Sequence, residues 1–199
     1  MKLVLASKNE HKLKEMQDIL SALGVEVVLE RDVGVDVDVE ETGETFEENA
    51  FLKAEAAMKA TGLPAVSDDS GLEVDALGGA PGVHSARYTG NHDDSDLDRR
   101  KFLMKNLEGE EHRTARFVSA ICCVFPNGDV LRARGTCEGR IATYMKGENG
   151  FGYDAMFIAD GEDRTMAEMT HEEKNEISHR GRALREFARV LKEYCNADK

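Results

Sequence analysis

Residues 2–29 read KLVLASKNEHKLKEMQDILSALGVEVVL, and this stretch decides the predicted fold class. The run KLVLA (2–6) is apolar enough for a buried strand. A polar loop follows, and then leucine and methionine recur at helical spacing until Gly24, which ends the predicted helix. VEVVL (25–29) is the next predicted strand. A strand, a helix and a strand in this order favour an α/β fold.

The rest of the chain keeps mixing strands and helices. The further predicted elements are a helix over 46–60 capped by Thr45, strands at 65–67 and 71–75 with an acidic turn between them, a helix near 93–107, β-hairpins over 114–141, a strand over 154–158 and an amphipathic helix over 178–194. They predict a twisted mixed sheet flanked by helices, in two lobes with a cleft between them. Without repeats or a clear linker, we expect a single domain over residues 1–199.

The charge balance limits the possible partners. The chain has 39 acidic and 26 basic residues and a net charge of -13, which argues against binding to nucleic acid polymers or anionic membranes. A small phosphorylated ligand stays compatible, because a local basic cluster or a metal reverses the local field. No apolar run approaches the ~20 residues of a membrane span, and the apolar stretch before Lys8 is too short for a signal peptide. The four cysteines form no CxxC pair, so we expect reduced thiols in a cytoplasmic protein.

The first candidate motif joins the first strand to a helix N-terminus. It consists of Ser7, Lys8, Asn9, Glu10, His11 and Lys12. Free backbone N–H groups and the positive end of the helix dipole favour an anion there. Ser7 and Asn9 add neutral donors, and Lys12 reaches a phosphate as a point charge. The glycines of a P-loop are missing, and an ordinary capped helix is the alternative.

The second candidate is the acidic segment Ser67-Asp68-Asp69-Ser70-Gly71. Consecutive strand residues point to opposite sides, so we expect one aspartate to bond a basic neighbour and the other to hold a hard divalent cation. An exposed Asx-turn is the alternative.

A third acidic stretch precedes the helix over 46–60. A carboxylate from Glu40 or Glu41 would complete a magnesium site with the DDSG segment, because Mg²⁺ needs few protein ligands besides water and phosphate oxygens. Lys53, on the helix that follows, can face the same cleft. For each of these charges the alternative is a solvated helix face.

Two further segments suit a nucleotide. In Gly150-Phe151-Gly152-Tyr153-Asp154 the glycines let the backbone approach a flat ligand, the two aromatic rings offer stacking faces, and Asp154 can accept a hydrogen bond. A β-turn with core aromatics is the alternative. The second segment gathers the basic residues Lys174, His179 and Arg180 near a capped helix start, which suits base recognition and phosphate neutralisation. Surface helix charges are the alternative there.

Taken together, these motifs resemble the inosine triphosphate pyrophosphatase family. The resemblance runs from Lys2 to about Leu191 and rests on SKNEHK (7–12), EETG (40–43), FEENAFLKA (46–54), SDDSGLEVDALGGAPGVHSARYTG (67–90), GFGYDAMF (150–157) and EKNEISHRGRAL (173–184). It implies Mg²⁺-dependent hydrolysis of ITP, dITP and XTP to the monophosphate and pyrophosphate. It also implies a homodimer with an elongated mixed sheet and a site in a cleft between lobes.

The same resemblance implies a role for each candidate. Residues 7–12 would hold the triphosphate, Glu40 and Asp69 would bind Mg²⁺, Asp69 would also activate the attacking water, and Ser70 would contact the substrate. The nucleotide would be bound and its purine read by Phe151, Gly152, Tyr153, Asp154, Lys174, His179 and Arg180. Attack at the α-phosphorus makes pyrophosphate the leaving group, whose charge Lys12 and Lys53 would stabilise. Rival readings are a pyrophosphatase for modified pyrimidine nucleotides, a non-catalytic nucleotide-binding regulator and a scaffold without a small-molecule site.

Overall fold

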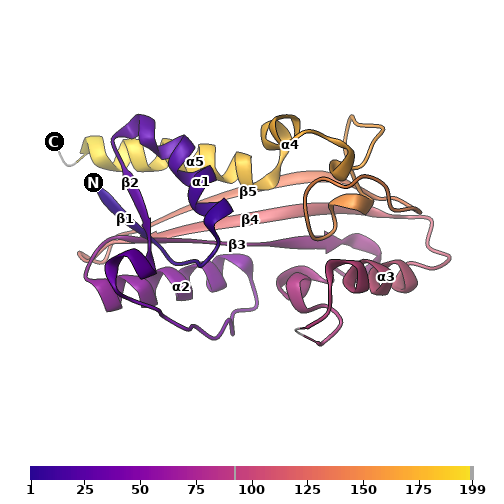
Figure 1. Ribbon diagram of the computed structural model, residues 1–199, viewed down its shortest axis with the longest axis horizontal. Coiled ribbons are helices and arrows are strands. Elements are labelled where there is room, and N and C mark those ends of the chain that lie inside the picture. Colours follow the sequence, from indigo (N-terminus) through magenta and orange to yellow (C-terminus); the bar gives the residue numbers. More distant parts are fainter. Residues whose placement is uncertain (92, 198–199) are drawn as a thin grey trace. The chain divides into compact units, whose positions relative to one another are not determined.

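The protein is described by a computed structural model over residues 1–91 and 93–197 (Figure 1). Six strands form one sheet in the order β2-β1-β3-β4-β5-β6. The strands are β1 (Lys2–Leu5), β2 (Glu26–Leu29), β3 (Ala65–Val74), β4 (Thr114–Val124), β5 (Val130–Ile141) and β6 (Phe157–Ala159). Strand β1 runs parallel to β2 and β3, whereas β5 and β6 are antiparallel. The sheet is therefore mixed, as the sequence predicts.

The helices are α1 (Glu10–Leu20), α2 (Phe46–Thr61), α3 (Asp96–Asn106), α4 (His171–Ile177) and α5 (His179–Ala197). The chain forms two compact units. The first consists of Met1–Asp69, Ser119–Gly135 and the chain from Arg182 onward, and the second of Ser70–Val118 and Thr136–Gly181. None of the described helices has both the length and the apolar character needed to cross a bilayer.

In the first unit, helices cover both faces of the sheet. Figure 1 shows α1 and α5 on one face and α2 on the other. The adjacent Cys122 and Cys123 belong to different cores: Cys122 packs with Ala50 and Ala54 of α2, and Cys123 with Phe187 of α5. This separation confirms that neighbouring residues of β4 point to opposite sides.

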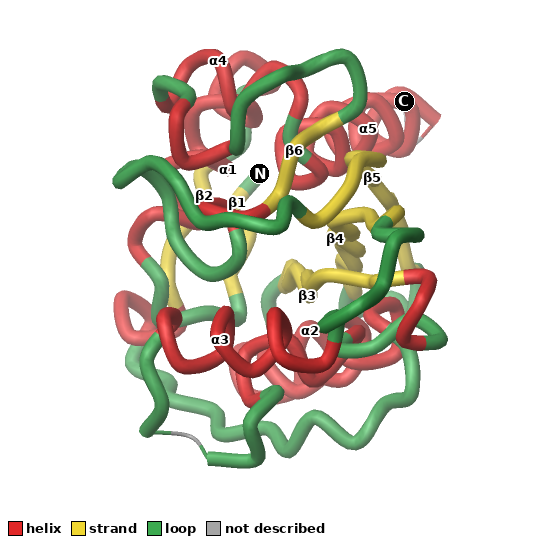
Figure 2. The backbone as a smooth tube through the Cα atoms, turned by 90° about the vertical axis from the view of Figure 1, so that its right-hand side faces the viewer, coloured by secondary structure: helices red, strands yellow, loops and turns green. Residues whose placement is uncertain are grey.

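In the second unit, one core joins strands β3, β4 and β6 to α3. Its largest buried side chains include Leu72 of β3, Leu103 of α3 and Phe157 of β6. Figure 2 shows α3 on one side of the strands and α4 on the other. The core holds α3 through Leu103 and the segment that precedes β6 through Tyr153 and Met156.

Two predicted element boundaries are wrong. Asp68, Asp69 and Ser70 do not form a turn, because β3 runs without interruption from Ala65 to Val74. Asp68 pairs with Lys12 and Asp69 with Lys53. Because both carboxylates are paired, the strand continues through these polar residues. The predicted strand over 154–158 is a 3₁₀ turn, Asp154–Met156, followed by the short strand β6.

Candidate active site

The loop before α1 forms a capped helix start. Asn9 is the N-cap, and its Oδ1 accepts hydrogen bonds from the backbone N–H groups of His11 at 2.9 Å and Lys12 at 3.3 Å. Ser7 Oγ accepts a bond from Asn9 N at 3.1 Å. The loop is therefore an ordinary capped helix start, as the alternative interpretation expected. The positive end of the α1 dipole lies at this loop.

The charged side chains of this loop have different surroundings. Lys8 and Glu10 are exposed and form ion pairs with Asp36 and Arg31, respectively. Lys12 instead reaches into the protein, where its Nζ lies 2.9 Å from Asp68 Oδ1, on a carboxylate only 4% exposed. His11 is exposed. Lys12 is therefore the member of the loop that the fold ties to the acidic strand.

Lys53 is the centre of a second polar cluster. Its Nζ donates to Glu41 Oε1 at 2.7 Å, to Asp69 Oδ1 at 3.1 Å and to the backbone oxygen of Asp68 at 3.1 Å. Burial alone would lower the pKa of Lys53, but the charges of Asp69 and Glu41 outweigh burial and raise it. Lys53 therefore stays charged and holds two carboxylates close to each other.

The surroundings of Asp69 change the pKa of its carboxyl group. Burial raises the pKa of Asp69 above its ordinary value, and the negative charge of Glu41 adds to this rise while Lys53 and Lys12 oppose it. A raised carboxyl pKa brings the group closer to neutral pH, where a general base works best. The other acid of the pair, Asp68, faces Lys12, so the two aspartates contact different lysines.

The cluster brings together hard oxygen donors, the ligand type that divalent cations prefer. Glu41, Asp68 and Asp69 carry three negative charges against the two positive charges of Lys12 and Lys53. Hard carboxylate oxygens with a net negative charge suit Mg²⁺, which uses one or two carboxylates together with substrate phosphates. Glu40 is exposed, whereas Glu41 shares the Lys53 ammonium with Asp69. Among residues 1–91 and 93–197, no group of three or more His, Cys, Asp or Glu is arranged to hold a metal.

The second unit contains the predicted nucleotide-binding residues. Phe151 is 61% exposed, and the Lys174 ammonium and the Arg180 guanidinium lie 4.8 Å and 5.8 Å from the centre of its ring. Asp154 is buried, and it accepts hydrogen bonds from Lys174 Nζ and, at 3.0 Å, from the backbone N–H of Phe151. An exposed aromatic ring flanked by two cations suits an electron-rich, negatively charged ligand such as a nucleotide.

The other predicted residues of this unit support the loop. The expectation of a free stacking face is wrong for Tyr153, which is buried and donates from its hydroxyl to the backbone oxygen of Ser85 at 2.8 Å. His179 is buried and stacks on Phe117, with 4.9 Å between the ring centres. Ser70 is half-buried on β3, next to Asp69.

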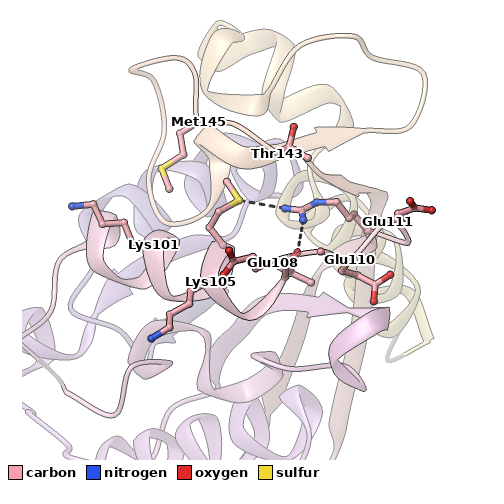
Figure 3. A pocket seen from close by; sticks show the side chains of 11 residues that line it. Lys101, Lys105, Glu108, Glu110, Glu111, Thr143 and Met145 are labelled. Carbon is pink, nitrogen blue, oxygen red and sulfur yellow. Dashed lines mark hydrogen bonds between the residues drawn. The ribbon is translucent and has the colours of Figure 1, made fainter.

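Three cavities are found among the described residues. One of about 380 Å³ borders Gly150, Met169, His171 and Lys174. One of about 150 Å³ lies in the first unit against Ser7, Lys8, Glu30 and Lys53. The largest of the three, about 720 Å³, lies along α3 and is lined by Lys101, Met104, Lys105, Arg113 and Met145, among others (Figure 3). The two smaller cavities therefore adjoin predicted site residues, and the largest does not.

Sequence reasoning missed one member of this arrangement. The backbone N–H of Gly152 donates to Asp96 Oδ2 at 2.6 Å, so the first residue of α3 holds the nucleotide loop. The capping pattern Ser95-x-x-Asp98 marks the start of α3 in the sequence. Gly152 and Asp96 are 56 residues apart, so no local sequence pattern predicts their contact.

Comparisons with known proteins agree with these features. The model of the Ham1 family matches residues 3–190. A dITP/XTP pyrophosphatase of Exiguobacterium sp. is 50% identical over 187 residues, 94% of this chain and 95% of that protein. The dITP/XTP pyrophosphatase of Bacillus subtilis is 45% identical over 190 residues, 94% and 96% of the two chains.

Solved structures show the same fold. The Staphylococcus aureus Ham1 protein is 41% identical, with a TM-score of 0.89 and full coverage of both chains. A HAM1 protein from Coxiella burnetii is 44% identical, with a TM-score of 0.92 over 97% of this chain and 99% of the other. The resemblance in the sequence is thereby confirmed, and the chain belongs to the Ham1 family.

Proposed function

We propose that this protein hydrolyses the noncanonical purine nucleoside triphosphates ITP, dITP and XTP to their monophosphates and pyrophosphate. The observation that carries the proposal is the Lys53 cluster, in which one half-buried ammonium contacts both Asp69 and Glu41. Relatives about half identical to this chain are named dITP/XTP pyrophosphatases. In this proposal, residues 1–199 act as one pyrophosphohydrolase domain.

Asp69 acts as the general base. Its raised pKa suits removal of a proton from a water molecule that attacks the α-phosphorus. The P–O bond to the β-phosphate breaks, and pyrophosphate leaves with the electron pair. Lys12, Lys53 and the N-terminus of α1 stabilise the charge on the triphosphate and on the leaving group. Ser7 and Asn9 position the phosphates, while Lys8, Glu10 and His11 line the exposed side of the loop.

Mg²⁺ is the proposed cofactor, and when bound it would polarise the phosphate oxygens and lower the pKa of the attacking water. Asp69 would hold it with one carboxylate of the Glu40–Glu41 pair. The family resemblance implies Glu40, whereas the shared contact with Lys53 favours Glu41.

The nucleoside part is assigned to the second unit. Phe151 stacks on the base, and Lys174 and Arg180, whose cations lie over the Phe151 ring, add positive charge there. Gly152 and Asp154 shape the turn. A donor from His179, Arg180 or the backbone would pair with the 6-oxo group of hypoxanthine or xanthine. Against the 6-amino group of adenine the same donor stays unpaired, which costs ~1–3 kcal/mol. We therefore expect adenine nucleotides to be disfavoured tens- to hundreds-fold.

The setting of this activity is also a proposal. We place it in the cytoplasm, where nucleotide pools lie, and the four free thiols are compatible with a reducing compartment. We further propose that the protein works as a homodimer, with neither nucleic acid polymers nor membranes as partners.

A nucleotide panel tests the function. Purified protein is incubated with ITP, dITP, XTP, ATP, GTP and modified pyrimidine triphosphates, with Mg²⁺ and with EDTA, and monophosphate and pyrophosphate are quantified. We expect equimolar monophosphate and pyrophosphate from ITP, dITP and XTP, and loss of activity in EDTA. Preference for a pyrimidine nucleotide, or binding without turnover, would reject the proposal.

A matched pair of variants tests whether Glu40 or Glu41 holds Mg²⁺ together with Asp69. Because Glu41 contacts Lys53 beside Asp69, we expect Glu41→Gln to raise the Mg²⁺ concentration for half-maximal activity at least tenfold. Glu40→Gln, an exposed neighbour with the same chemical change, is expected to shift it less than threefold. The reverse order of effects would assign the role to Glu40.

A further inference from the structure

The turn that presents Phe151 is held from two sides. On its inner side, Asp154 accepts the N–H of Phe151 at 3.0 Å and the ammonium of Lys174. Gly150 has a φ of +77°, and a Cβ there would lie 2.1 Å from Asp154 Oδ2, so a side chain does not fit. Gly152 also has a positive φ, +58°, but its Cβ position is open. The turn therefore packs tightly at Gly150 and needs a separate restraint at Gly152.

That restraint is Asp96, the first residue of α3. Its Oδ2 accepts the backbone N–H of Gly152 at 2.6 Å, and its Oδ1 accepts a bond from Arg99 Nη2 at 2.5 Å. Arg99 is itself fixed by a bond to the backbone oxygen of Asp94 at 2.6 Å. Each oxygen of one carboxylate thus has its own partner, one on the helix and one on the turn.

The charge state of Asp96 suits this task. Burial alone would raise the pKa of Asp96, but the hydrogen bonds from Arg99 and Gly152 outweigh burial and lower this pKa. The N-terminus of α3 stabilises the same negative charge. An ionised carboxylate makes a stronger bond to a backbone N–H than a neutral acceptor does.

We propose that Asp96 is a positioning residue, which fixes the Gly150–Tyr153 turn so that the Phe151 ring faces the substrate beside Lys174 and Arg180. This inference rests on the proposed function, since it assumes that Phe151 binds the base. Asp96 touches neither the phosphates nor the reacting atoms in this proposal. Its loss should therefore weaken binding of the nucleoside part while the chemical step stays intact.

The test compares Asp96→Asn with Asp98→Asn. Both variants remove one negative charge from the first turn of α3, but within residues 1–91 and 93–197 the hydrogen bonds of the Asp98 carboxylate go to Ser95 of the cap. We expect Asp96→Asn to raise KM for ITP about tenfold with kcat within twofold, as lost substrate binding predicts. Inhibition by IMP should weaken in parallel, whereas inhibition by pyrophosphate should not change. Asp98→Asn should leave all four values within twofold.

Amide hydrogen exchange supplies a readout that does not depend on activity. Exchange of the peptide containing Gly152 should be faster in Asp96→Asn than in wild type or Asp98→Asn. Faster exchange together with the KM rise supports the proposal. Unchanged KM in an active protein, or equal weakening of IMP and pyrophosphate inhibition, would overturn it. Absence of pyrophosphate release by the wild type would instead reject the proposed function.

Discussion

We expect Lys12 to have both a functional and a structural role. It contributes charge to the phosphate loop, and its Nζ neutralises the buried Asp68 at 2.9 Å. Lys12→Ala should therefore raise KM for ITP and also lower the free energy of unfolding by roughly 2 kcal/mol, because a buried charge loses its partner. Urea unfolding and steady-state kinetics measure the two effects.

A double variant separates these two roles. Lys12→Ala with Asp68→Asn removes both charges, so it should recover most of the lost stability while KM stays high. If KM returned to the wild-type value together with stability, the role of Lys12 at the phosphates would be rejected.

Glu30 is a buried carboxylate outside the proposed chemistry, and burial raises its pKa. Since the folded-state pKa lies above the unfolded one, ionised Glu30 destabilises the fold at neutral pH, and this cost disappears as pH falls through the folded-state pKa. Glu30→Gln should therefore be more stable than wild type at neutral pH, with a smaller difference near pH 4. Urea unfolding at both pH values measures this, with the exposed Glu26→Gln as control. A variant less stable at both pH values would contradict the argument.

At the scale of single elements, α1 depends on its cap. Asn9 satisfies the N–H groups of His11 and Lys12, so Asn9→Ala should lower the free energy of unfolding by about 1 kcal/mol. Asn9→Asp keeps an acceptor oxygen and should retain most of the stability. Thermal unfolding of the three proteins tests this, and equal losses in both variants would show that the cap bond does not stabilise α1.

Element boundaries were predictable where local signals govern them. The caps Thr45 and Gly62 bound α2 close to the predicted helix, and the turn before Val130 separates β4 from β5 as expected. Strand β3 was not predictable through Asp68 and Asp69, because their polarity signals a turn locally. The partners that keep them in a strand, Lys12 and Lys53, lie on α1 and α2.

At the scale of the whole molecule, the sequence predicts a mixed sheet flanked by helices, but the strand order depends on pairing between distant segments. The predicted site residues are found in both compact units. Lys12, Lys53 and Asp69 belong to the first unit, and Phe151 and Lys174 belong to the second. The residue types were predictable from motifs, whereas contacts such as Glu41 with Lys53, or Asp96 with Gly152, were not.

In the proposed mechanism, Asp69 activates water for attack on the α-phosphorus. Hydrolysis of ITP in ¹⁸O-labelled water with Mg²⁺ tests it most directly, with mass spectrometry of both products. We expect one ¹⁸O atom in IMP and none in the pyrophosphate, and a kcat reduced about 10³-fold in Asp69→Asn. Label in the pyrophosphate, release of phosphate instead of pyrophosphate, or an unchanged kcat in the folded Asp69→Asn protein would contradict the account.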